Sequence, residues 1–207
     1  MTTDKAQKKR DLILDKAKEL FIQRGYAATS MDELVRYIGV SKGSIYYHFK
    51  SKEELFIQLL ARQNREWINA WMEKSSAFSS FEERVYGIAD HMVDDFQNPL
   101  VKVGEEFYIS QPENKHLLDQ ILQIMQEPRM LYRNIFAEAA KEGFLPEEDL
   151  DEIAIIFSSM LDGLSISYYE RSSDELRVLY RRSVGYFLYG ILGASKKQVD
   201  LNEKPGM

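Results

Sequence analysis

The chain has 207 residues, of which 44% are hydrophobic and 29% are charged, and it contains no cysteine. These values are ordinary for one large or two small globular domains and exclude wholesale disorder. The lack of cysteine excludes a disulfide scaffold, an iron–sulfur site and cysteine-ligated zinc. No run approaches the roughly 18 apolar residues of a membrane-spanning helix. The basic N-terminus also lacks the apolar stretch of a secretory signal, so we expect a soluble, cytoplasmic protein.

The formal net charge of −6 conceals an uneven distribution along the chain. Residues 1–52 contain 11 Lys and Arg against 6 Asp and Glu, a net charge of +5. The remaining residues contain 16 against 27, a net charge of −11. A basic segment beside an acidic one is a hint of nucleic-acid contact at the basic end. Two merely solvated surfaces would give the same division, so charge alone does not decide between these readings.

Helical spacing of apolar residues recurs along the chain, and no period-2 run of β-branched residues is long enough to predict a strand. Four Ser-x-x-Glu pairs fit the capping box, in which each side chain satisfies an unpaired backbone N–H at a helix start. They begin at Ser30, Ser51, Ser80 and Ser172. The sequence therefore predicts an all-α fold of about nine helices. The expected ranges are 7–24, 30–37, 41–47, 51–76, 80–97, 100–110, 113–142, 147–170 and 173–195.

Residues 30–49 show the most specific pattern in the chain. A short amphipathic helix after Ser30 is broken by Gly39, and Ser41 is placed to cap a second short helix. Two short helices joined by a tight glycine-containing turn indicate a helix-turn-helix, whose second helix enters the major groove of DNA. Ile45 and Phe49, four residues apart, are expected to anchor that second helix. A simple helical hairpin with Tyr46 and Tyr47 in its core is the alternative interpretation.

The residues around the turn favour the DNA interpretation because several independent features coincide. Gly43 has no side chain, so backbone and DNA can approach closely. The neighbouring side chains that form hydrogen bonds are expected to face the groove: Lys42, Ser44, Tyr46, Tyr47 and His48. Residues near the start of a helix are expected to bind phosphate, because the helix dipole and the side-chain charge act together there. Those residues are Thr29, Lys50 and Lys52.

The run from Ile13 to Phe56 resembles the N-terminal domain of the TetR family of bacterial transcriptional regulators. The matching elements are Ala17-x-x-Leu20-Phe21-x-x-x-Gly25-Tyr26, then Thr29-Ser30-Met31, then the continuous stretch from Gly39 to Leu55 with Tyr46-Tyr47-His48-Phe49 at its centre. The resemblance implies an all-α homodimer that binds palindromic operator DNA. It also implies a repressor that a small molecule releases from that DNA.

Carried over position by position, the resemblance assigns roles to individual residues. Lys42, Gly43, Ser44 and Tyr46 would face bases. Thr29, Tyr47, His48, Lys50 and Lys52 would hold phosphates. Residues 1–52 would form the DNA-binding domain, with its helix-turn-helix at 30–49. Residues 53–207 would form the effector-binding and dimerisation domain, with a connecting helix at 51–76 and dimer helices at 147–195.

The acidic part of the chain is expected to contain the effector site and the dimer interface. Two strongly apolar helices within 147–195 can pack both inside the subunit and on a second copy, although a buried pair in a monomer would look the same. Aromatic residues and methionines of the middle helices can line an apolar ligand cavity, or simply form the core. The cavity residues expected here are Trp67, Trp71, Phe107, Phe136 and Met160. Few basic residues lie in this region, which favours a neutral or cationic apolar effector.

An enzyme is the main alternative class, and the sequence lacks the parts for it. Glu113-x-x-His116 has the spacing of a di-iron carboxylate pair, but the second pair that such a site needs is missing. His91 with Asp94 or Asp95 fits a surface charge cluster better than a metal site. No phosphate-binding loop, dinucleotide fingerprint or nucleophile motif occurs. We therefore expect neither catalysis nor a cofactor or metal. A purely structural helical bundle would explain the acidic part but not the basic segment.

Overall fold

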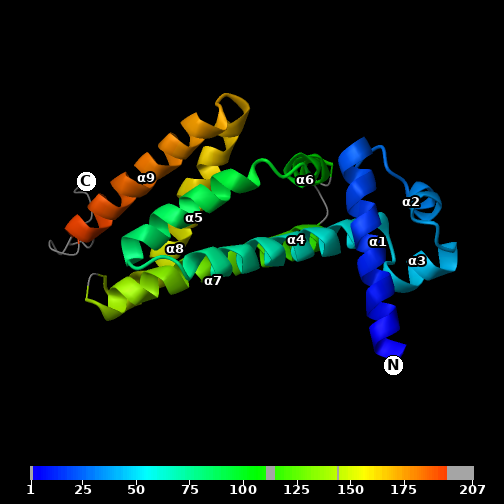
Figure 1. Ribbon diagram of the computed structural model, residues 1–207, viewed down its shortest axis with the longest axis horizontal. Helices are drawn as coiled ribbons and strands as arrows, with labels where there is room; N and C mark the ends of the chain where they lie inside the picture. The colour runs from blue at the N-terminus through cyan, green and yellow to red at the C-terminus, as the bar shows by residue number, and fades with distance from the viewer. Residues whose placement is uncertain (1, 111–114, 144, 195–207) are drawn as a thin grey trace, which may run out of the picture. The chain divides into compact units, whose positions relative to one another are not determined.

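The computed structural model describes residues 2–110, 115–143 and 145–194, which form α-helices and short 3-10 helices without a strand. The all-α prediction is confirmed (Figure 1). The elements are α1 (Thr2–Arg24), α2 (Met31–Ile38), α3 (Lys42–His48), α4 (Lys52–Ser75), α5 (Phe81–Asp95), α6 (Leu100–Ile109), α7 (Lys115–Lys141), η1 (Glu147–Asp149), α8 (Leu150–Leu164), η2 (Ser165–Tyr169) and α9 (Ser173–Ala194). None of these helices combines the length and the apolar character that crossing a membrane requires.

The predicted helix starts agree with the caps that form. Ser30 and Ser80 make complete capping boxes at the starts of α2 and α5. Ser172 does the same before α9, where its Oγ accepts from the Glu175 N–H and its own N–H donates to the Glu175 carboxylate. At Ser51 only half of the box forms. The Glu54 carboxylate there accepts the N–H of Lys50 at 2.7 Å instead of the N–H of Ser51.

The single helix expected over residues 147–170 is replaced by a shorter α-helix with a 3-10 segment at each end. The structure has the 3-10 turn η1 after Pro146, then α8 over Leu150–Leu164, then the five-residue 3-10 helix η2. Pro146 adopts extended backbone, with ψ of 137°, so a regular helix cannot include it. Tighter 3-10 turns are common where an α-helix begins or ends.

The chain divides into two compact units. The first comprises Met1–Trp67 and Gln97–Met125, and therefore includes α1, α2, α3, α6 and parts of α4 and α7. Its core is built on the apolar face of α1, where Ile13, Ala17 and Phe21 are fully buried. The aromatic rings of Tyr26, Phe56 and Phe107 pack against one another with centroids 4.7–5.0 Å apart.

The second unit comprises Ile68–Phe96 and Gln126–Met207, and contains α5, α8, α9 and the remaining parts of α4 and α7. Helices α5 and α9 run side by side in it (Figure 1). Phe136 of α7 and Phe157 of α8 form the aromatic centre of its core, with centroids 5.1 Å apart, and Phe187 of α9 lies within 6 Å of both. These units follow internal contacts rather than function, so the functional boundary between residues 52 and 53 stays a prediction.

Candidate functional site

Helices α2 and α3 form the predicted turn because a glycine and a serine end one helix and begin the next. Gly39 adopts the left-handed conformation, with φ of +72°, and its N–H closes α2 on the carbonyl of Val35. This conformation favours glycine because a Cβ would crowd the backbone. Ser41 then caps α3, where its Oγ accepts from the Ser44 N–H at 3.1 Å. Ile45 and Phe49 are completely buried, so they fix which face of α3 points outward.

The outward face of α3 carries the side chains that the sequence predicts to contact DNA. Tyr47 is 76% exposed and Tyr46 is 38% exposed, so neither belongs to the core. Gly43 is exposed, and a Cβ built on it would meet nothing within 4 Å. Lys42 is also exposed, and its Nζ donates to Asp32 of α2 at 2.8 Å. The core-tyrosine alternative for this hairpin is therefore wrong.

Basic residues of α1 lie near the C-terminal end of α3, and the sequence patterns alone did not single them out. Arg10 of α1 lies over the ring of Phe49, with 5.4 Å between its guanidinium carbon and the ring centroid. Burial lowers the pKa of His48, and the positive charges of Arg10 and Lys9 lower it further. Both effects favour the neutral imidazole, in which one nitrogen donates a hydrogen bond and the other accepts one. The basic run at residues 8–10 was the available sequence signal for this contribution.

Two of the predicted phosphate ligands are engaged inside the first unit instead. Thr29 is 1% exposed, and its hydroxyl donates to the carbonyl of Gly25 at 2.8 Å. Lys52 is half-buried, and its Nζ donates to the carbonyl of Tyr26 at 3.0 Å and lies 4.0 Å from the Tyr26 ring centroid. Burial lowers the pKa of this amine, although Glu53, Glu106 and Glu33 oppose the shift. In this conformation neither side chain is directed to an external phosphate.

The five residues expected to line a ligand cavity are divided between the two units: Trp67 and Phe107 belong to the first, whereas Trp71, Phe136 and Met160 belong to the second. The prediction that Phe107 lines a ligand cavity needs correction, because its ring packs against Tyr26 and Phe56 in the core of the first unit. Trp71 and Phe136 are buried in separate clusters of the second unit. Trp71 lies beside Phe78 and His91, whereas Phe136 lies beside Phe81, Phe157 and Phe187. Trp67 and Met160 are half-buried.

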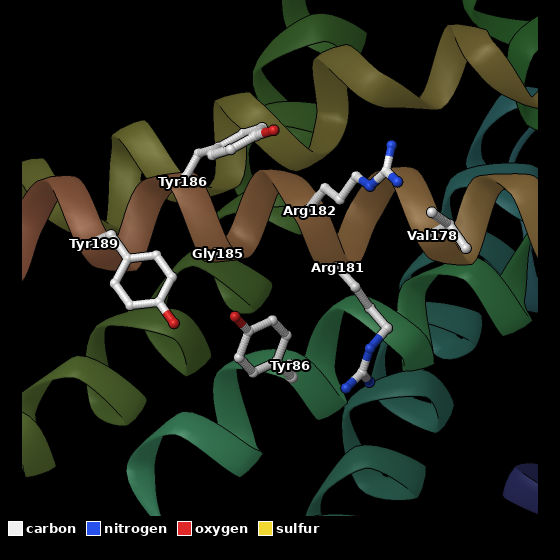
Figure 2. A pocket seen from close by; sticks show the side chains of 7 residues that line it. All are labelled: Tyr86, Val178, Arg181, Arg182, Gly185, Tyr186 and Tyr189. Carbon is white, nitrogen blue, oxygen red and sulfur yellow. The ribbon is translucent and has the colours of Figure 1, made fainter.

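An open groove lies along α9, and none of those five residues lines it. Figure 2 shows Tyr86 reaching from α5 toward α9 at Gly185, with Arg181 and Tyr189 on the same side. The remaining lining residues are Val178, Arg182 and Tyr186. The Arg181 guanidinium carbon is 5.0 Å from the Tyr86 ring centroid. Apolar rings and cationic side chains are thus exposed together on this face of α9.

The metal-site alternatives find no support in the described part of the chain, where no group of three potential ligands occurs. The Nδ1 of His91 lies 3.2 Å from the Nζ of Lys74, so a cationic side chain occupies that position. Glu113 of the predicted Glu113-x-x-His116 pair lies outside the described residues.

Two family models match the chain and together span most of it. The model for bacterial regulatory proteins of the tetR family matches residues 13–59, which contain α2, α3 and the second half of α1. The model for the C-terminal region of QacR-like proteins matches residues 63–193. The first match includes the whole outward face of α3 described above, and the second covers more than half of the chain.

Individual proteins agree with these matches. The transcriptional regulator QacR of Staphylococcus aureus is 28% identical over 183 residues, which is 88% of this chain and 97% of QacR. A TetR-family transcriptional regulator from Pectobacterium atrosepticum has the same fold, with a TM-score of 0.72 at 16% identity over 92% of this chain and 97% of that one. FadR from Bacillus subtilis, solved in complex with stearoyl-CoA, has a TM-score of 0.71 at 18% identity over 86% and 97%. The chain belongs to the TetR family of DNA-binding transcriptional regulators, not to a family of enzymes, and has a QacR-like C-terminal region.

Proposed function

We propose that this regulator is a dimeric repressor that binds a palindromic operator through α3 and is released by a small apolar effector. The observation that carries the proposal is the outward face of α3. It presents exposed groups that form hydrogen bonds on a helix anchored by the buried Ile45 and Phe49. We assign the base contacts to Lys42, Gly43 and Ser44 in the first turn of α3 and to Tyr46 in the next turn.

Phosphate contacts fall to the residues that follow along the same surface. We assign them to Tyr47, His48 and Lys50, and we leave Thr29 and Lys52 out because their polar groups bond within the first unit. The Nζ of Lys42 has to leave Asp32 before it can contact DNA, which is feasible because both side chains are more than 60% exposed. Phosphate contacts position the protein, whereas base contacts select the sequence.

The proposed dimer forms on the exposed faces of α8 and α9. Val178, Arg182, Tyr186 and Tyr189 recur at helical spacing along α9, and Tyr186 and Tyr189 are more than 75% exposed. Ile155 and Ile156 add exposed apolar surface on α8. Large apolar side chains exposed on neighbouring helices are typical of an interaction site.

The proposed effector site lies in the second unit, where Trp71, Phe136 and Met160 remain candidates to line it. The acidic character of residues 53–207 supports a neutral or cationic apolar effector. Trp71 and Phe136 are fully buried, so we expect side chains to rearrange when a ligand enters.

One experiment tests the division between base and phosphate contacts. Operator duplexes are first selected from random DNA, and binding is measured on the selected and on a scrambled duplex across several salt concentrations. Lys50→Ala should weaken binding to both duplexes by similar factors and reduce the salt slope by about one. Ser44→Ala and Tyr46→Ala should weaken binding to the selected duplex alone. Lys141→Ala removes the same charge from the exposed end of α7 and serves as the control.

Two results of this experiment would contradict the proposal. The first is a failure of the wild-type protein to prefer any selected duplex over the scrambled one. The second is an equal loss on both duplexes for every α3 variant. Adding a panel of neutral and cationic apolar compounds to the complex tests the effector, and none of them releasing the DNA would contradict that part.

A further inference from the structure

Tyr26 lies in the turn between α1 and α2, and each of its polar groups forms a hydrogen bond with a side chain of the first unit. Its N–H donates to Glu106, its carbonyl accepts from Lys52 and its hydroxyl donates to Glu53, at 2.9, 3.0 and 3.2 Å. Its ring is buried against aromatic neighbours, which are Phe21, Phe56 and Phe107. The position of this turn is therefore strongly determined, and the turn leads directly into Thr29 and α2.

Glu106 comes from α6, about eighty residues further along the chain, and uses both carboxylate oxygens on this turn. Its Oε2 accepts from the Tyr26 N–H and its Oε1 accepts from the Ala27 N–H, both at 2.9 Å. The helix that carries it is anchored in the core of the first unit by the buried Val103 and Phe107. Hydrogen bonds from backbone N–H groups to a charged carboxylate are about twice as strong as neutral ones.

Gly25 makes this close approach possible. It ends α1 with φ of +84°, and a Cβ built on it would lie 2.7 Å from Oε2 of Glu106. Any larger residue would therefore be strained in its backbone and would also push the carboxylate away from the turn. The carbonyl of the same glycine accepts the hydroxyl of Thr29, which links the turn to the start of α2.

We propose that Glu106 is a positioning residue for operator recognition. From α6 it fixes the α1–α2 turn, and through that turn it sets the placement of α2 and α3. The three N-terminal helices then need the Glu106 carboxylate of α6 to present α3 correctly to DNA. This inference rests on the proposed role of α3, because it concerns how accurately that helix is presented to DNA.

The test compares Glu106→Gln with Asp119→Asn, which removes the same charge from an exposed position of α7 within the first unit. Amide exchange at Tyr26 and Ala27 is followed by NMR, and affinity is measured on the selected operator and on a scrambled duplex. For Glu106→Gln we expect faster exchange at one or both amides, about tenfold weaker operator binding and unchanged binding to the scrambled duplex. Asp119→Asn should match the wild type in all three measurements.

The design separates positioning from simple loss of folded protein. Partial unfolding would lower both affinities by the same factor, so an equal loss on the two duplexes would overturn the proposal, as would unchanged operator binding with faster exchange. If Glu106→Gln does not fold, Glu106→Asp is used instead, because it keeps the charge but shortens the side chain. Wild-type operator affinity in Glu106→Asp would also overturn the proposal. The exchange measurement needs no DNA and therefore does not depend on the proposed function. If the proposed function is wrong, the Tyr26 and Ala27 amides of the wild-type protein still exchange slowly, but the protein prefers no selected duplex.

Discussion

At Gly43 of α3, we expect a side chain to affect the stability of the protein and its DNA binding in opposite directions. It lies in the first turn of α3, exposed, with open space where a Cβ would be. No contact within the described part of the chain requires glycine there, and a side chain at this position would restrict the backbone of the unfolded state. On the proposed DNA-binding face, the missing side chain leaves room for the backbone of α3 to approach DNA closely.

Gly43→Ala should leave the melting temperature unchanged or raise it, because alanine is favoured over glycine in a helix by roughly 0.5–1 kcal/mol. The same variant should bind the operator about tenfold or more weakly, since a lost base contact is worth roughly 1–3 kcal/mol. Thermal melting and a gel-shift titration measure the two effects. Gly104→Ala on α6 is the control, because its Cβ would make an ordinary 3.7 Å contact with Leu60. A binding loss no larger than that of the control would contradict the expectation.

At the scale of elements, ion pairs connect helices of the second unit that are distant in sequence. Asp94 of α5 accepts from the Nζ of Lys74 on α4 at 3.0 Å and from Nη2 of Arg177 on α9 at 2.7 Å. Arg181 adds a bond to Asp90, one turn earlier on α5. Burial alone would raise the pKa of Asp94, but the hydrogen bonds from Arg177 and Lys74 outweigh it and lower the pKa below its ordinary value.

A lowered pKa in the folded state makes this link depend on pH with a definite sign. The stabilisation is present above the ordinary aspartate pKa of about 3.9 and is lost as the pH falls through the lower, folded-state pKa. Asp94→Asn should reduce stability at pH 7 by about 1 kcal/mol, since the pair is partly exposed to solvent, or about 2–4 °C in melting temperature. Melting curves from pH 7 to pH 3 should show this difference shrinking, whereas a constant difference would contradict the mechanism. Glu73→Gln on α4 is the exposed control.

At the scale of the whole molecule, charge and oligomeric state have to be considered together. The basic residues 1–52 and the acidic remainder carry net charges of +5 and −11. A dimer doubles the basic surface available to the phosphates of a palindrome, while the acidic parts are repelled by them. Two linked DNA-binding segments also bind more tightly than one, by a factor of 10²–10⁴ or so.

Tyr186→Asp combined with Tyr189→Asp should therefore produce a monomer, because it places charge on the exposed face of α9. Light scattering measures the mass, and binding should fall by about 10²-fold or more on the palindrome but not on a half-site duplex. Tyr108→Asp is a matched control, since that tyrosine of α6 is 57% exposed in the first unit. A double variant that stays dimeric would exclude this face as the interface.

The sequence by itself determined the all-α class, most helix ranges and the outward residues of α3, because these depend on neighbours within one or two turns. The Ser30–Glu33 box and the Gly39 turn are local in this sense. Only the tertiary structure decided the residues whose partners lie far away in the chain. It turned Lys52 and Thr29 inward, placed Phe107 in the core of the first unit and brought Glu106 to the backbone of Tyr26. Helical periodicity predicts that a side chain is buried or exposed, but the partner that it meets depends on how distant helices pack.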